Sequence, residues 1–364
     1  MSTNNYKITI HISRTNTISE IITNVPFPNS VLGRGDKISF SKQKITIQAV
    51  RTKKYTPTEI VTNKNNSLYG QIFKSLIYLY VVNGNKIKII SIDIERHTKR
   101  IKDPKISFDI SSEEQPIKYN FALRYPISNF VKNKIWEECN EAYSIRAILT
   151  LWLATISSND RYYIFERSWR TFERLCFYKS RAISDLNEFT AIKNIKDYIY
   201  HNLPSFHDSI TIASSIGIRD LKKYDWSGYI KSEFLPLSKS TKSKPYTEKY
   251  KNHLVICNTD WRIMTILRDT LSIREAELRH HNVYNDIVTH ITTELGHNVV
   301  ANEQVLCFLC CKYAYFLRNK MFHGEKPDYT FTFSKDTIDN KMIDKLNYLL
   351  SSLINELLLI IDRL

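Results

Sequence analysis

Residues 305–324 read VLCFLCCKYAYFLRNKMFHG, and this stretch closes the most apolar helix that the sequence predicts. Apolar side chains recur along it at the spacing of one helix face: Ala314, Phe316, Leu317, Met321 and Phe322. Gly324 stands where a C-terminal helix cap is expected, and Pro327 follows, as is common beyond a helix end. The sequence therefore predicts a buried helix whose last turn contains Arg318, Asn319 and His323.

The polar residues of this last turn suit phosphodiester chemistry. Asn319 and His323 are four residues apart and share a helix face, and Arg318 lies near the edge of that face. The negative end of the helix dipole favours the protonated imidazole, which suits acid–base chemistry near neutral pH. Arginine binds phosphate oxygens, the amide orients, and histidine transfers protons. The alternative is that Arg318 and His323 are ordinary surface residues at the end of a core helix.

Arg318, Asn319 and His323 form an R-N-x-x-x-H cluster, which resembles the signature of the HEPN superfamily. Members of this superfamily are small helical domains, and many are metal-independent ribonucleases. A similar arginine–histidine spacing begins at Arg274. The copy at 318–323 is preferred because Asn follows the arginine, Gly follows the histidine, and the preceding helix is the most apolar in the chain.

A second feature resembles the early helix of HEPN domains, which often carries an acidic residue within an apolar face. Trp169, Phe172 and Glu173 follow this pattern in a predicted helix over 161–179. A carboxylate on an apolar face is expected to be paired, and the resemblance points to Arg318 or His323 as its partner. The alternative is that Glu173 is a solvated helix position.

The resemblance implies an RNA-cleaving domain, commonly a homodimer, of the kind found in prokaryotic antiviral, abortive-infection and toxin systems. The ribose 2′-hydroxyl would attack the adjacent phosphorus and leave a 2′,3′-cyclic phosphate, without a metal or other cofactor. Two proton transfers are needed and each chain offers one motif histidine, so two motifs would face each other across a two-fold axis. Arg318 would stabilise the phosphorane, with Asn319 at the edge and Glu173 behind.

Two other classes of function are compatible with the sequence. One is a nucleic-acid sensor in which the HEPN-like part only dimerises. The other is a toxin subunit that a regulatory or sensor protein holds inactive.

The basic residues are concentrated in the first third of the chain. The whole chain carries 52 Lys and Arg against 37 Asp and Glu, a net charge of +15. Residues 1–125 hold 20 of the basic and 9 of the acidic residues, a net charge of +11. This excess predicts a polyanionic partner, in particular nucleic acid, and the resemblance implies RNA; lysine can also serve solubility alone. The candidate contact residues are Lys53, Lys54, Arg96, Lys99, Arg100 and Lys102.

The six cysteines and the N-terminus predict a cytoplasmic protein. The chain begins with polar residues rather than a signal peptide, and no apolar run reaches the length of a membrane span. Free cysteines fit a reducing compartment. Cys307, Cys310 and Cys311 resemble half of a zinc site, but no second pair at metal spacing accompanies them. We therefore expect them in the helix core.

The pattern of apolar residues predicts an α+β chain. Residues 1–125 form a β-rich recognition domain, sandwich or barrel-like, and residues 130–364 form an all-α, HEPN-like bundle. Within the first domain, residues 72–82 and 86–95 are expected to pair as a hairpin through Asn83-Gly84. The second is expected to hold helices over 135–156, 161–179, 260–268, 274–297, 301–323 and 336–364, short helices over 185–230, an exposed loop over 239–251 and an extended connector over 328–334.

Overall fold

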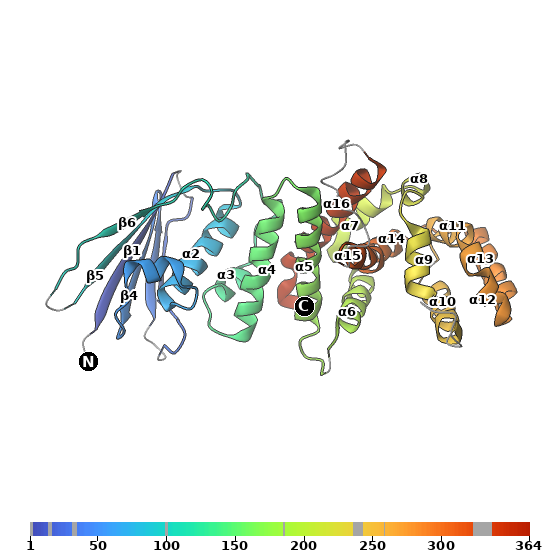
Figure 1. Cartoon of the computed structure of the whole chain (residues 1–364), viewed down its shortest axis with the longest axis horizontal. Coiled ribbons are helices and arrows are strands. Elements are labelled where there is room, and N and C mark those ends of the chain that lie inside the picture. Colours follow the sequence, from blue (N-terminus) through green and yellow to red (C-terminus); the bar gives the residue numbers. More distant parts are fainter. Residues whose placement is uncertain are drawn as a thin grey trace. The chain divides into compact units, whose positions relative to one another are not determined.

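The computed structural model describes residues 3–13, 17–30, 35–98, 101–184, 186–235, 243–257, 259–322 and 337–364. Contacts divide the chain into two compact units, Met1–Asp160 with Leu358–Leu364, and Arg161–Leu357 (Figure 1). No helix within the described residues is long and apolar enough to cross a membrane.

The first unit is built on one antiparallel sheet in the order β2-β3-β4-β1-β5-β6. Its strands are β1 (Asn4–Ile12), β2 (Glu20–Val25), β3 (Asp36–Ser41), β4 (Lys44–Arg51), β5 (Ile89–His97) and β6 (Ile106–Asp109). Strand register aligns Ile38, Ile47, Ile8 and Ile94 in one row across four strands, and all four are at most 1% exposed. The described strands form a single open sheet, so the prediction of a sandwich or barrel was wrong.

A helix, rather than a second sheet, covers the apolar face. Helix α1 (Pro57–Thr62) precedes α2 (Ser67–Asn83), which lies between the sheet and α4 (Figure 1). The predicted hairpin over 72–95 was therefore wrong in its first half, since residues 72–82 are helical. Because α2 is buried on both sides, it lacks the one-sided apolar stripe of a surface helix and resembles a buried strand in sequence. Asn66 caps its start and Gly84, at φ 68°, ends it in the left-handed region.

Two further helices, α3 (Asn129–Lys134) and α4 (Asn140–Ile156), also belong to the first unit. The helix predicted over 135–156 is confirmed from residue 140 onward, but its predicted start was wrong. Helix α4 begins only after Cys139, whose thiol accepts from the backbone N–H of Ala142. The change from strands to helices occurs near residue 129, whereas the compact unit extends to residue 160. The predicted domain ranges 1–125 and 130–364 stay a prediction.

The described part of the second unit is helical throughout its regular structure. Its helices are α5 (Arg161–Lys179), α6 (Glu188–His201), α7 (His207–Ser214), α8 (Ile218–Leu221), α9 (Trp226–Phe234), α10 (Ser243–Cys257), α11 (Trp261–Asp269), α12 (Glu275–His280), α13 (Tyr284–His297), α14 (Asn302–Cys307), α15 (Ala314–Phe322) and α16 (Ile338–Leu359). The α+β class is confirmed.

Several predicted elements of this unit can be compared directly with the structure. The helix over 161–179 is confirmed, and the helix predicted over 260–268 corresponds to α11, which Asp260 caps by accepting from the backbone N–H of Arg262 at 2.9 Å. The single helix over 274–297 was wrong, since α12 and α13 are separate. The loop over 239–251 was wrong from residue 243 onward, where α10 begins; the connector over 328–334 lies outside the described residues.

The predicted motif helix is a run of three segments, α14, a π-helical turn over Phe308–Tyr313, and α15. Such widened turns inside helices frequently occur at functional sites. Cys307, Cys310 and Cys311 are at most 2% exposed, which confirms the prediction that they pack in the core.

Candidate functional site

The end of α15 holds two of the three motif residues in a defined arrangement. Arg318 and Asn319 are both half-buried, and Arg318 Nη1 donates to Asn319 Oδ1 at 2.8 Å. The Arg318 guanidinium also lies 4.8 Å from the centroid of the Phe322 ring. These contacts limit how the guanidinium can turn. His323 follows in sequence but lies outside the described residues.

Glu173 lies on α5, as expected, and α5 packs against both α6 and α15. The rings of Trp169 and Tyr315 meet between α5 and α15 with centroids 5.9 Å apart. The carboxyl group of Glu173 is hydrogen-bonded to that of Glu188, the first residue of α6, and the positive charge of Arg318 also acts on Glu188. The structure therefore brings Glu173 and Arg318 to one corner, where both interact with Glu188.

Glu188 is a functional candidate that the sequence analysis missed. Burial, followed by the hydrogen bond with Glu173 and its negative charge, raises the pKa of Glu188 to about 7. Arg318 and a hydrogen bond with Tyr315 oppose this shift. One carboxyl oxygen, Oε1, is buried without a hydrogen-bond partner among the described residues. A carboxyl group with a pKa near 7 can accept or donate a proton at neutral pH.

No signal in the sequence distinguishes Glu188 from an ordinary helix-terminal residue. It follows Asn187, whose side chain caps α6 by accepting from the backbone of Thr190 at 2.9 Å. Acidic residues are common in the first helical turn because the helix dipole stabilises them. Only the packing of α5 against α6 shows that this carboxyl group meets Glu173.

Two exposed aromatic rings and their cations adjoin this corner. Phe322 is 57% exposed and also has the guanidinium of Arg170 at 5.8 Å from its centroid. Phe189 is 63% exposed and has the ammonium group of Lys312 at 5.0 Å. Exposed rings with neighbouring cations are suited to stack nucleobases and contact phosphates in single-stranded RNA.

The basic residues predicted in the first unit gather at one end of the sheet. Lys53 and Lys54 are exposed after β4, and Lys102 is exposed opposite His97. A groove of about 260 Å³ is lined by Lys54, Arg96 and neighbouring tyrosines. Lys99 and Arg100 lie outside the described residues.

Arg96 is less available to a ligand than its neighbours. Its Nε donates to Asp103 Oδ2 at 2.5 Å, and its Nη1 donates to Asn4 Oδ1 at 3.4 Å. The side chain is 12% exposed. Because Asp103 offsets its charge, the two lysines are the stronger candidates for phosphate contacts.

We expect the affinity of the chain for single-stranded RNA to fall steeply with salt, since phosphate contacts release counterions. Replacing Lys53 and Lys54 together with Ala should lower the slope of log K against log salt by about 1.4, or about 0.7 per contact. The measurement is a titration of fluorescent oligouridylate at several salt concentrations. Lys42→Ala with Lys44→Ala, two exposed lysines at the opposite end of β4, is the charge-matched control. Equal slopes for both double variants would leave only bulk charge as the explanation.

Comparison with known proteins gives no match: no protein-family model, curated protein or solved structure matches the chain. Among the described residues, no group of three or more His, Cys, Asp or Glu is placed to hold a metal ion.

Proposed function

We propose that this chain is a metal-independent endoribonuclease of HEPN type that acts through the residues around Arg318. The observation that supports the proposal is the meeting of Arg318, Asn319, Glu173 and Glu188 at one corner of three packed helices. This corner combines a phosphate-binding cation with a group that titrates near neutral pH. Those are two of the groups that RNA cleavage by the ribose 2′-hydroxyl requires.

The proposed reaction assigns one role to each group. Glu188 takes the proton from the 2′-hydroxyl, whose oxygen attacks the adjacent phosphorus. Arg318 binds the phosphate oxygens and stabilises the additional charge of the phosphorane. His323 gives a proton to the departing 5′-oxygen, which leaves a 2′,3′-cyclic phosphate. Glu173 acts through Glu188 as a positioning residue, because its hydrogen bond and charge help to raise the pKa of Glu188.

Glu188 changes the argument for a dimer. With the histidine alone, each chain offers one proton-transfer group, and two protomers have to share a site. With Glu188 and His323, one chain contains both groups required by the chemistry. A homodimer, a role in antiviral defence or as a toxin, and control by a partner protein remain part of the proposal through the resemblance alone.

The decisive experiment is incubation of the purified full chain with RNA in excess EDTA. We expect cleavage at an unchanged rate, because no step uses a metal ion, and 5′ fragments that end in 2′,3′-cyclic phosphate. A His323→Ala preparation controls for contaminating ribonucleases. RNA that is bound but stays intact would favour the non-catalytic sensor, and cleavage that stops in EDTA would contradict metal independence.

A further inference from the structure

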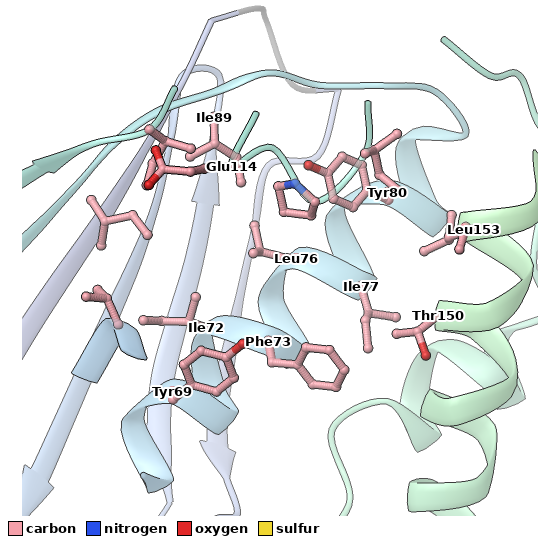
Figure 2. A pocket seen from close by; sticks show the side chains of 16 residues that line it. Tyr69, Ile72, Phe73, Leu76, Ile77, Tyr80, Ile89, Glu114, Thr150 and Leu153 are labelled. Carbon is pink, nitrogen blue, oxygen red and sulfur yellow. The ribbon is translucent and has the colours of Figure 1, made fainter. Parts of the chain in front are cut away.

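The first unit contains an apolar pocket of about 420 Å³ that the proposed ribonuclease site does not use (Figure 2). Helix α2 supplies much of its wall, and α1, β5, the segment after β6 and α4 supply the rest. Figure 2 shows Leu76 near the middle, with Ile72 and Ile77 on the same helix and Leu153 across from them. Pockets that bind small molecules occupy about 300–1,000 Å³.

The pocket is open to solvent, and several of its apolar lining side chains are buried. Ile72, Ile77, Ile89 and Leu153 border the space, yet each is at most 5% exposed. An apolar occupant would cover part of Phe73, which also lines the pocket and is 39% exposed. An apolar cavity of only about 150 Å³ binds benzene in a well-studied case, so this volume is ample for a larger hydrocarbon.

Two hydroxyl groups in the wall are already hydrogen-bonded to backbone carbonyls. The Tyr80 hydroxyl donates to the carbonyl of Ile87 at 3.3 Å, and the Thr150 hydroxyl donates to the carbonyl of Arg146 at 3.0 Å. A buried water needs two to four polar partners. Water near these two hydroxyl groups therefore has few polar partners and would exchange readily for an apolar molecule.

Glu114 is the one charged residue among the described residues that line the pocket. It is exposed, and Figure 2 places it beside Ile89, on the side away from Thr150. The backbone N–H of Ser111 donates to Glu114 Oε2 at 2.9 Å, and this bond lowers the pKa of Glu114. The carboxylate is therefore ionised at neutral pH and gives one end of the pocket a negative charge.

We propose that this pocket binds a small apolar molecule that carries a protonated amine. The hydrocarbon body packs against Leu76 and Ile72, and the ammonium group pairs with Glu114. Anionic amphiphiles bind more weakly because the same carboxylate repels them. The site lies wholly within the first unit and goes beyond the proposed RNA chemistry.

The test uses the full chain and three ligands of equal length: octylamine, octanol and octanoate. The readout is displacement of the neutral fluorescent probe N-phenyl-1-naphthylamine by each ligand. We expect octylamine to bind about fivefold more tightly than octanol, from one ion pair at a solvated rim, and octanoate to bind most weakly. Equal displacement by the amine and the alcohol would overturn the proposed ligand class.

Two variants locate the binding. Glu114→Gln keeps an acceptor for Ser111 but loses the charge, so the amine should lose its fivefold advantage while octanol is unaffected. Leu76→Trp fills the centre of the pocket and should abolish probe binding. Its control is Ile90→Trp, because Ile90 is 48% exposed on β5 and does not line the pocket. Thermal unfolding checks that the Leu76→Trp protein folds. If it does not fold, the amine preference of the Glu114→Gln protein tests the proposal instead. Undiminished probe binding by a folded Leu76→Trp protein, or an unchanged amine preference in Glu114→Gln, would overturn the proposal.

Discussion

Replacing Arg318 with Ala should slow RNA cleavage by about 10²–10³-fold, the usual effect of removing one group that stabilises transition-state charge. The guanidinium donates to Asn319 and lies over Phe322, so it is held in place before RNA binds. A held cation stabilises the phosphorane without first having to be ordered. Single-turnover cleavage of a defined RNA measures the effect, because it separates the chemical step from product release.

Two further variants test whether the effect depends on the planar guanidinium of Arg318. Arg318→Lys keeps the charge but loses the planar fork, so its rate should lie between those of the wild type and Arg318→Ala. Arg279→Ala removes an exposed arginine that pairs with Glu275 on α12, away from the motif helix in sequence, and should cleave at the wild-type rate. Wild-type cleavage by a folded Arg318→Ala protein would refute the assigned role.

The parts of the site that could be predicted from sequence are those that depend on local spacing. Arg318 and Asn319 are neighbours on one helix, so their proximity requires only that the helix forms. Glu173 stood out because it is acidic within an apolar helical face. Glu188 could not be found in this way, because its environment depends on the packing of α5 against α6.

The same distinction between local spacing and tertiary packing explains the main error in the predicted fold. Helix α2 is buried against the sheet on one side and near α4 on the other, and its apolar residues therefore follow no single period. Asn83-Gly84 is a preferred hairpin turn and also a suitable helix end, since Gly accepts positive φ in both. The local sequence is therefore compatible with both a hairpin turn and a helix end. The helix is favoured because it covers the apolar face of the sheet.

Replacing Glu188 with Gln should lower cleavage at pH 7 by about 10²–10⁴-fold, the usual contribution of one proton-transfer group. As the base, Glu188 acts in its ionised form, so the wild-type rate should rise with pH. The midpoint of this rise should lie near 7, the pKa of this carboxyl group. Glu188→Gln should lose that rise. The measurement is the single-turnover rate between pH 5 and 9.

A variant of Glu173 tests whether this residue sets the pKa of Glu188, which a merely structural residue would not do. Glu173→Gln removes the charge that helps to raise the pKa of Glu188, so the midpoint of the pH profile should move below 7. It should not reach the ordinary value of a glutamate, because burial, the largest cause of the shift, remains. A pH profile unchanged in both variants would show that Glu188 is not the base.

The stability of the fold gives an independent check on Glu188. Its folded pKa, about 7, is above the ordinary glutamate value of 4.5, so the folded protein binds this proton more tightly than the unfolded chain. The resulting stability is fully present below about pH 4.5 and is lost as the pH rises through 7. Glu188→Gln, which stays neutral, should therefore unfold at a higher temperature than the wild type at pH 8 and at a similar temperature at pH 4. A variant that is more stable but cleaves RNA far more slowly would mean that Glu188 serves the reaction at the expense of the fold.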